Sequence, residues 1–401
     1  MTIKDKKDET LLAHLGRDPE RFQGAVNVPV FRASTILAPD LETWEDPQRR
    51  KRRGAVTYGR AGTPTSYALE ETMAELEGGS GAVSLPSGLA AISVALLAYL
   101  EAGDHMLVTD AVYRPGRRLC DTILKRLGVE TTYFDPLIGG DIAKLFRPNT
   151  RLVYLESPGS LTFEVQDVPA IAAAAKAAGL AVILDNSWAT PLYFRSFEQG
   201  VDVSLYAGTK YVVGHSDAML GLVVGRDREA EDRLRKTARG LGVCAGSEEQ
   251  FLGLRGLRTL AVRLARHHQT ALALAEWLAE RPEVERVLYP PLPSDPGHAL
   301  WQRDFTGASG LLGFALAQPT PRRALAAMID GLELFGIGAS WGGYESLIIP
   351  TDDELAEREI LPYRADGPSL RIHAGLEDPG DLIADLDAGF ARMREAARVS
   401  A

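Results

Sequence analysis

The chain has few residues of the kinds that mark several protein classes. Only two cysteines, Cys120 and Cys244, occur among 401 residues. They provide no disulfide framework, and their spacing is not that of a metal site. The formal net charge of −10 argues against a nucleic-acid or membrane-surface ligand. No basic and apolar signal segment opens the chain, so we expect a cytoplasmic location.

Long hydrophobic runs are also missing. Residues 82–100 carry no charge, but Pro86, Ser87 and Gly88 interrupt the run. The interruption leaves about twelve apolar residues from Leu89, which suit a buried core helix better than a bilayer crossing. One basic run, residues 49–53, is interpreted as a solvated loop rather than an anion-binding patch.

The remaining composition is that of a globular enzyme, with 24% charged and 45% hydrophobic residues. Residues 1–62 lack sustained periodicity and predict an arm that packs on something else, such as a neighbouring subunit. Residues 63–257 alternate helix and strand patterns, which predicts an α/β fold with a mostly parallel sheet covered on both faces. Residues 258–401 predict a smaller α+β domain.

The predicted elements place polar residues at strand ends. Helices are expected at 67–76, 89–100, 117–127, 169–178 and 260–278. Strands are expected at 105–109, 130–134, 152–155, 181–184, 203–206, 220–224, 311–315 and 370–373. Active sites in such folds lie beyond the C-terminal ends of the strands.

Lys210 and Asp185 follow two successive strands of this predicted sheet. A lysine amine can bond to the aldehyde of pyridoxal phosphate (PLP), and a carboxylate can keep the pyridine nitrogen protonated. Together they predict a PLP site. Alone, a lysine in a Thr-Lys pair after a strand is more often an exposed surface residue.

Four further features have both a functional and an ordinary interpretation. Ser87 and Gly88 open an apolar helix and can hold a phosphate or serve only as an N-cap. Tyr113 can stack on a planar ring or pack in a loop. Arg60 suits phosphate recognition or a surface turn. Arg371 lies within an apolar strand pattern, where its charge needs a substrate carboxylate or a structural acid as partner.

The order and spacing of these residues resemble the Cys/Met-metabolism family of PLP enzymes, of fold type I, over nearly the whole chain. Within it, the sequence is most similar to the bacterial β-lyases that act on cystathionine. The segments that carry the resemblance are Tyr58-Gly-Arg-Ala-Gly-Thr63, Glu75-Leu-Glu-Gly-Gly79, Phe134-Asp-Pro-Leu-Ile-Gly139, Glu156-Ser-Pro-Gly-Ser160, residues 209–219, Arg255-Gly-Leu-Arg-Thr-Leu260, Arg303-Asp-Phe-Thr-Gly307, Ser340-Trp-Gly-Gly-Tyr-Glu-Ser-Leu347 and Gly375-Leu-Glu-Asp378.

The resemblance implies a seven-stranded sheet in the larger domain and a role for each matching residue. Lys210 would be the Schiff-base lysine and the base at the substrate Cα, with Tyr113 stacking on the cofactor and assisting proton transfer. The other cofactor-binding residues would be Asp185, Ser87, Gly88, Leu89 and Thr209, with Tyr58 and Arg60 from a neighbouring subunit. The substrate-binding residues would be Arg371, Ser340, Trp341 and Tyr58. The resemblance also implies a homo-oligomer with shared active sites, expected to be a tetramer built as a dimer of dimers, with a dimer as the alternative.

The implied reaction is β-elimination from L-cystathionine, giving homocysteine, pyruvate and ammonia, as in methionine biosynthesis. Trp341, Ala339 and Ala207 favour it over the γ-lyases and γ-synthases of the family, which remain the alternative. Ala339 is small, so other cysteine S-conjugates are possible substrates. A third possibility is a binding protein on the same scaffold that has lost the cofactor.

Overall fold

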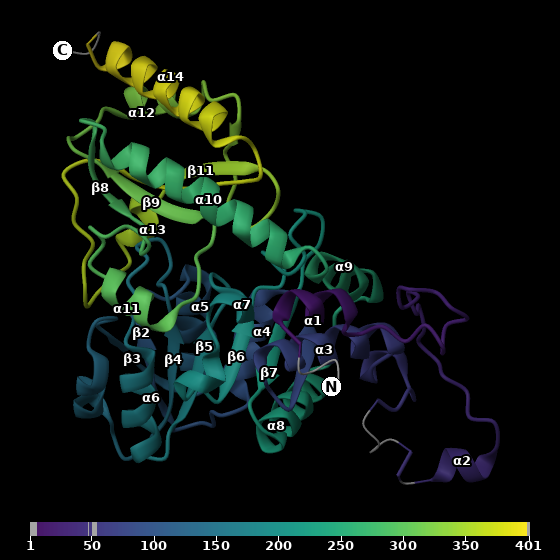
Figure 1. Cartoon of the computed structure of the whole chain (residues 1–401). Helices are drawn as coiled ribbons and strands as arrows, with labels where there is room; N and C mark the ends of the chain where they lie inside the picture. The colour runs from purple at the N-terminus through teal and green to yellow at the C-terminus, as the bar shows by residue number, and fades with distance from the viewer. Residues whose placement is uncertain (1–5, 47, 50–53, 399–401) are drawn as a thin grey trace.

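A computed structural model describes residues 6–46, 48–49 and 54–398. Two sheets form two blocks, with the C-terminal block stacked on one end of the larger one (Figure 1). The larger sheet has seven strands in the order β1-β7-β6-β5-β4-β2-β3. Its strands are β1 (Gly81–Leu85), β2 (His105–Thr109), β3 (Glu130–Phe134), β4 (Thr150–Glu156), β5 (Ala181–Asp185), β6 (Val203–Tyr206) and β7 (Gly221–Gly225).

The larger sheet is mostly parallel, which confirms the predicted fold class. Strands β3, β2, β4, β5 and β6 pair in parallel. Only β7 runs against its neighbours, β1 and β6. The C-terminal ends of β4, β5 and β6 therefore lie at one edge of the sheet, where a parallel α/β fold forms its site.

Helices cover both faces of this sheet. Alternate residues of β4 point to opposite sides: Leu152 and Tyr154 pack in the cluster that includes α4 and α8, while Val153 and Leu155 pack with α6. Several helices begin at a side-chain N-cap, such as the Asp227 carboxylate that accepts from the Ala230 amide at 3.0 Å. The helices up to residue 257 are α1 (Asp8–His14), α2 (Leu41–Glu45), α3 (Pro64–Glu77), α4 (Gly88–Leu97), α5 (Arg114–Arg118), α6 (Val168–Ala177), α7 (Thr190–Tyr193), α8 (Arg228–Leu241) and α9 (Ser247–Leu257).

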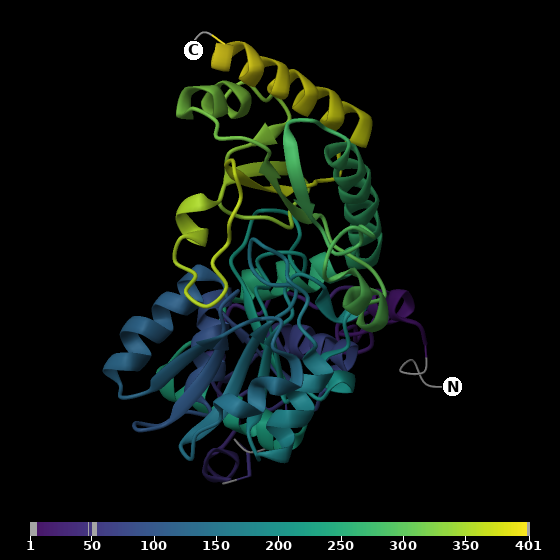
Figure 2. The same cartoon turned by 90° about the vertical axis from the view of Figure 1, so that its left-hand side faces the viewer.

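The C-terminal block is a five-stranded sheet in the order β10-β11-β12-β9-β8, with helices packed on it (Figure 2). Apart from the parallel pair β10 and β11, its strands are antiparallel. Its elements are α10 (Leu260–Ala279), β8 (Val284–Leu288), α11 (His298–Asp304), β9 (Leu311–Leu316), α12 (Arg322–Ile329), β10 (Phe335–Gly336), β11 (Ser346–Pro350), α13 (Asp352–Leu355), β12 (Ser369–His373) and α14 (Pro379–Arg398). The predicted boundary at residue 258 stays a prediction, although the two sheets lie on either side of it.

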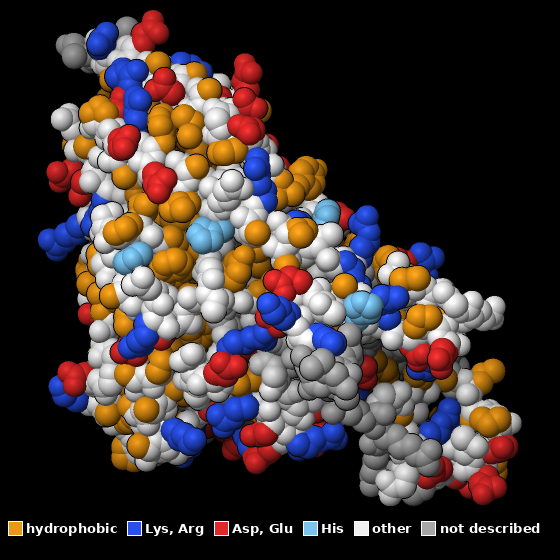
Figure 3. Space-filling view, viewed as in Figure 1, with side chains coloured by type: hydrophobic (Ala, Val, Ile, Leu, Met, Phe, Trp, Pro, Cys, Tyr) orange, Lys and Arg blue, Asp and Glu red, His pale blue; other side chains and the backbone are white. Residues whose placement is uncertain are grey.

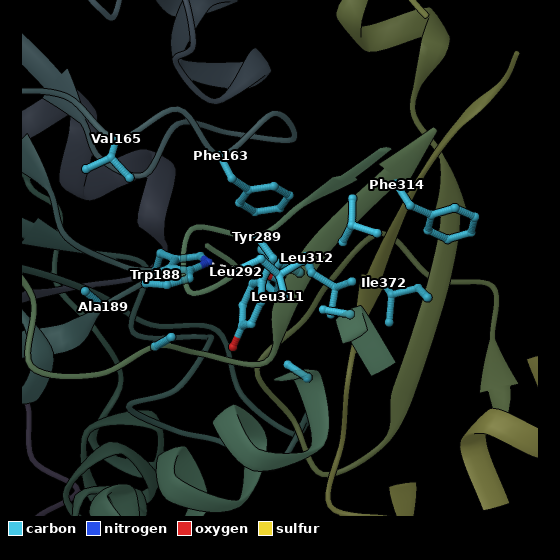
Figure 4. Close-up of a cluster of buried hydrophobic side chains, with 14 of the residues drawn as sticks. Phe163, Val165, Trp188, Ala189, Tyr289, Leu292, Leu311, Leu312, Phe314 and Ile372 are labelled. Atoms are coloured by element: carbon cyan, nitrogen blue, oxygen red, sulfur yellow. Dashed lines mark hydrogen bonds between the residues drawn. The ribbon is translucent and has the colours of Figure 1, made fainter. Parts of the chain in front are cut away.

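One hydrophobic core continues across the two blocks. Trp188 of the larger block packs beside Leu292 and Leu311 of the smaller one (Figure 4). The Trp188 indole N–H also donates to the Leu311 carbonyl at 3.1 Å. Shared burial of this kind fixes how the blocks meet, because separating them would expose large apolar side chains to water.

One part of the N-terminal segment packs against the rest of its own chain, and another part is exposed to solvent. Leu11 and Leu12 of α1 are buried in a core cluster with α3 and α9. The chain that follows, with α2, projects from the larger block (Figure 1) and leaves Leu37 and Trp44 exposed. The beginning of the predicted arm thus packs on its own chain. Of the basic run, residues 50–53 lie outside the described residues.

On the face in Figure 3, acidic and basic side chains of the described residues are interspersed. Among the helices of the described residues, none is both long and apolar enough to cross a membrane.

Candidate active site

Asp185 and Lys210 meet at the C-terminal edge of the larger sheet. Asp185 is the last residue of β5, and Lys210 lies in the turn after the neighbouring strand β6. The Asp185 carboxylate accepts from the Ser187 amide at 3.0 Å. Burial raises the pKa of Asp185, and the opposing influences are the Ser187 hydrogen bonds and the Lys210 charge. A carboxylate in this position needs a cationic or N–H partner.

Lys210 is partly buried beneath a loop of the C-terminal block. Its Nζ donates to Ser340 Oγ at 2.8 Å and lies 5.3 Å from the centre of the Trp341 ring. Burial lowers the pKa of Lys210 to about 8, the nearby Arg371 charge acts in the same direction, and Asp185 opposes both. The amine is therefore much easier to deprotonate than an ordinary lysine.

Arg371 forms hydrogen bonds to backbone carbonyl groups of that loop. It lies on β12 with 8% of its surface exposed, and its guanidinium donates to the Ala339 and Ser340 carbonyl oxygens at 3.1 Å each. Burial lowers its pKa to about 10, still leaving it cationic at neutral pH. No described carboxylate forms an ion pair with it, which leaves charge for an anionic ligand.

The N-terminus of α4 forms a cradle close to the same edge. Ser87 caps the helix by accepting from the Ala90 amide at 3.1 Å. A Cβ on Gly88 would approach the Ala207 Cβ to 2.8 Å, so only glycine fits between the helix and the segment after β6. The amide groups at the start of this helix suit a phosphate. The Thr209 hydroxyl is engaged with backbone: it accepts from the Leu220 amide at 2.9 Å and donates to the Leu220 carbonyl at 3.1 Å.

Tyr113 lies beside this pocket and is partly open to solvent. The residue is 43% exposed, and its backbone amide donates to Glu156 Oε2 at 2.7 Å. Burial raises the pKa of the Tyr113 phenol, with Glu156, Glu354 and Asp185 acting in the same direction and Arg371 against them. Among the predicted residues, the structure thus gathers Lys210, Asp185, Ser87, Gly88, Leu89, Tyr113, Thr209, Ser340, Trp341 and Arg371 around one edge of the sheet.

Tyr58 and Arg60 lie elsewhere in the same chain. Arg60 donates to the Arg239 carbonyl at 3.0 Å, near the end of α8. Both residues line a hollow of about 310 Å³ between the arm and the body, together with Arg235. Within the described part of the chain, no hydrogen bond or ion pair links either residue to Lys210.

Two residues at the site had no predicted role. Glu156 ends β4 beside Asp185, and His373 follows Arg371 by two positions on β12. Both had a signal in the sequence. Glu156 ends a strand pattern as Asp185 does, and residues two apart on a strand share a face.

The side chains present fit PLP. They supply an amine of lowered pKa, a buried carboxylate, an exposed aromatic ring, a glycine-lined helix N-terminus and a guanidinium. An amine, a carboxylate and a phosphate cradle match the aldehyde, the pyridine nitrogen and the phosphate of the cofactor.

Comparison with known proteins gives the same assignment. The chain is 47% identical over 395 residues to cystathionine β-lyase MetC of Escherichia coli, covering 98% of this chain and 100% of that one. It is 48% identical over 385 residues to a putative cystathionine β-lyase of Rhizobium johnstonii, covering 95% of each. The solved structure of a cystathionine γ-synthase from Xanthomonas oryzae is similar with a TM-score of 0.88 and 32% identity, covering 98% of this chain and 99% of that one. The family model for Cys/Met metabolism PLP-dependent enzymes matches residues 9–391. The chain therefore belongs to the Cys/Met metabolism PLP-dependent enzyme family, and PLP is its cofactor.

Proposed function

We propose that this enzyme is a carbon–sulfur β-lyase that cleaves L-cystathionine to homocysteine, pyruvate and ammonia, a step of methionine biosynthesis. The observation that carries the proposal is the placement of Lys210 beneath the Ser340–Trp341 loop, with Arg371 directly behind that loop. A base and a carboxylate-binding cation thereby face one small pocket. The cytoplasmic location predicted from the sequence belongs with this proposal.

Arg371 is the residue that binds the substrate α-carboxylate. Its buried guanidinium remains cationic and its planar fork suits a carboxylate. Ser340 and Trp341 line the pocket next to it, and Tyr58 of a second copy contributes to the same pocket. Fixing the carboxylate orients the Cα–H bond relative to Lys210, which is what a proton transfer requires.

Lys210 moves the protons of the reaction. When bound, PLP withdraws electrons from the substrate Cα and so acidifies its proton. With its pKa lowered to about 8, the Lys210 amine is suited to accept that proton near neutral pH. Lys210 or the Tyr113 phenol then protonates the sulfur that leaves Cβ.

The remaining residues hold the cofactor. Asp185 would pair with the pyridine nitrogen, and Tyr113 would stack on the ring. Ser87, Gly88, Leu89 and Thr209 would bind the phosphate, together with Tyr58 and Arg60 from a second subunit. The open backbone at the start of α4 and the positions of Tyr58 and Arg60 away from their own Lys210 support this division.

The γ-lyase or γ-synthase alternative is less well supported, because the relatives named β-lyase are more similar than the γ-synthase structure. The products released from L-cystathionine distinguish the β-lyase from the γ-acting alternatives. Incubation with L-cystathionine should release pyruvate and homocysteine, identified by chromatography and mass spectrometry. Release of 2-oxobutyrate and cysteine instead would reverse the assignment. Cysteine S-conjugates tested in parallel show whether the small Ala339 side chain permits other thioethers.

We also propose a tetramer, arranged as a dimer of dimers with active sites shared across each dimer. The projecting arm and the exposed Leu37 and Trp44 support an interface there. Mixed Arg60→Ala and Lys210→Ala chains should regain part of the activity, because one site of each mixed dimer has both residues intact. Mixed chains that stay inactive, although they are shown to exchange subunits, would contradict sharing.

A further inference from the structure

Strand β12 directs two polar side chains towards the loop over Lys210. Arg371 and His373 are two residues apart, so they lie on the same face of the strand, while Ile372 between them packs in the hydrophobic core. Arg371 contacts the beginning of the loop through the Ala339 and Ser340 carbonyl groups.

His373 contacts the far end of the same loop. The Gly342 amide donates to His373 Nε2 at 3.1 Å, and the Gly343 carbonyl oxygen lies 3.1 Å from the same nitrogen. A backbone N–H can only donate, so Nε2 acts as the acceptor and the ring is neutral. His373 is 1% exposed. Burial, and next the neighbouring His267, hold its pKa well below the usual range, which keeps the acceptor available at working pH.

The loop has little freedom once Gly342 is fixed. Gly342 has a φ of +86°, and a Cβ there would lie 2.9 Å from the Lys210 carbonyl carbon. The loop therefore rests directly on the Lys210 backbone. Ser340, two residues earlier, accepts from Lys210 Nζ at 2.8 Å. A shift of Gly342 would move Ser340 away from the amine.

Helix α10 secures the end of β12 that carries His373. The His267 ring lies 5.1 Å from the His373 ring and 5.4 Å from that of Tyr211, which follows Lys210. His267 Nδ1 lies 2.8 Å from the Ala374 carbonyl oxygen and donates to it. Burial lowers the pKa of His267 to about 4, so this ring is neutral as well. The two histidines add no charge beside Lys210.

We infer that His373 is a positioning residue, which holds the Ser340–Gly343 loop against Lys210 by accepting the Gly342 amide hydrogen bond. Arg371 and His373 then fix the two ends of the loop from one strand, and the substrate pocket keeps its shape between them. The catalytic consequence rests on the proposed lyase function, whereas the hydrogen bond does not depend on it.

The test compares His373→Leu with His373→Gln in the holoenzyme. Leucine removes the acceptor, while the glutamine side-chain oxygen can accept from the Gly342 amide as Nε2 does. His105→Leu is the matched control, because His105 is also fully buried but bonds only to Thr150 and Thr132 within the larger sheet. Amide hydrogen exchange of peptides covering residues 339–345 reports on the loop without requiring turnover.

We expect His373→Leu to accelerate exchange of the loop peptide and to raise KM for L-cystathionine about tenfold, the size of effect that loss of one buried hydrogen-bond partner produces. His373→Gln should stay within about threefold of the native enzyme in both measurements. His105→Leu should lower stability and leave the loop exchange unchanged.

Two results would overturn the inference. One is unchanged loop exchange in His373→Leu, and the other is a glutamine variant as impaired as the leucine variant. If the native enzyme fails to release pyruvate from L-cystathionine, the proposed function fails, and the exchange data still decide the role of His373.

Discussion

Glu156 and Asp185 are register partners at the ends of adjacent parallel strands, so two carboxyl groups lie side by side at the cofactor edge of the sheet. Burial, and next the Asp185 charge, raise the pKa of Glu156 well above its ordinary value. We therefore predict that Glu156 holds the proton of this pair and that Asp185 carries the negative charge offered to the pyridine nitrogen.

Glu156→Gln should consequently preserve function, because it replaces a neutral acid by a neutral amide that can still accept from the Tyr113 amide. We expect kcat/KM within about threefold of the native value, and a loss of about tenfold in Glu156→Leu, which removes the acceptor. Steady-state pyruvate release measures both. Equal losses in the two variants would mean that the enzyme needs an ionised Glu156.

Lys210→Ala should lower the rate of pyruvate release by about 10²–10⁴-fold through loss of the proton-transferring amine alone. Lys236→Ala provides the matched control, since Lys236 is exposed on α8 away from the pocket. The control should behave as the native enzyme does. Retained activity in Lys210→Ala would remove the central residue of the proposed mechanism.

The lowered pKa of Lys210 predicts selective reactivity of the cofactor-free protein. The neutral amine is the nucleophile, and Lys210 loses its proton around pH 8, whereas an ordinary lysine has a pKa of 10.5. Acetylation followed by peptide mass spectrometry should show a rate at Lys210 that rises up to about pH 8 and then levels off. The rate at exposed Lys236 should continue to rise. Identical profiles would contradict the lowered pKa.

Gly342→Ala should weaken both stability and catalysis. The new Cβ would meet the Lys210 backbone at 2.9 Å, and alanine is strained at a φ of +86°. We expect a loss of about 1–3 kcal/mol in the free energy of unfolding, with a raised KM. In Gly240→Ala, within α8, the Cβ meets no atom within 4 Å. That control should gain up to about 1 kcal/mol, measured by denaturant unfolding.

The raised pKa of Glu77 predicts that the stability of the folded protein depends on pH. This buried carboxyl accepts from the Ser196 amide at 2.8 Å and from the Tyr206 hydroxyl, and burial raises its pKa from 4.5 to about 8. Between these values the folded chain keeps a proton that the unfolded chain has lost. The contribution of Glu77 to the free energy of unfolding therefore falls by about 1.4 kcal/mol per pH unit between pH 4.5 and about pH 8. Above about pH 8 this contribution is constant.

Glu77→Gln should lack this contribution. The free energy of unfolding of Glu77→Gln minus that of the native protein should increase from pH 5 to about pH 8 and then stay constant, as measured by urea unfolding at each pH. A difference that does not vary with pH would show that Glu77 is ionised in the folded protein.

The sequence was sufficient for the elements with clear periodicity. Strands 105–109, 130–134 and 203–206 have the predicted bounds. Strands 105–109 and 203–206 are uninterrupted buried runs, whereas 130–134 is buried only at its end. The helix expected at 117–127 differs: α5 ends at Arg118, and residues 119–124 continue as a π-helical turn. Hydrophobic spacing does not distinguish these two kinds of helical hydrogen bonding.

Contacts between distant segments were harder to predict from the sequence. The sequence indicated that Lys210 and Asp185 lie at one edge, because parallel strands end together. Nothing in local pattern says that Ser340 reaches Lys210 Nζ, or that Arg371 contacts the loop rather than an acid such as Glu377. Glu377 instead accepts from the Ser346 amide and hydroxyl. Such pairings depend on how the two blocks pack.

The pairing of β1 with β7 also bears on when the start of α4 can become ordered during synthesis. Strand β1 leads directly into the Ser87 cap of α4, and β7 is its only neighbour in the described sheet. A strand at the sheet edge gains its hydrogen bonds only after its partner has been made, and such long-range closure is slow. The start of α4 therefore gains the support of a paired strand only after residues 221–225 have been synthesised.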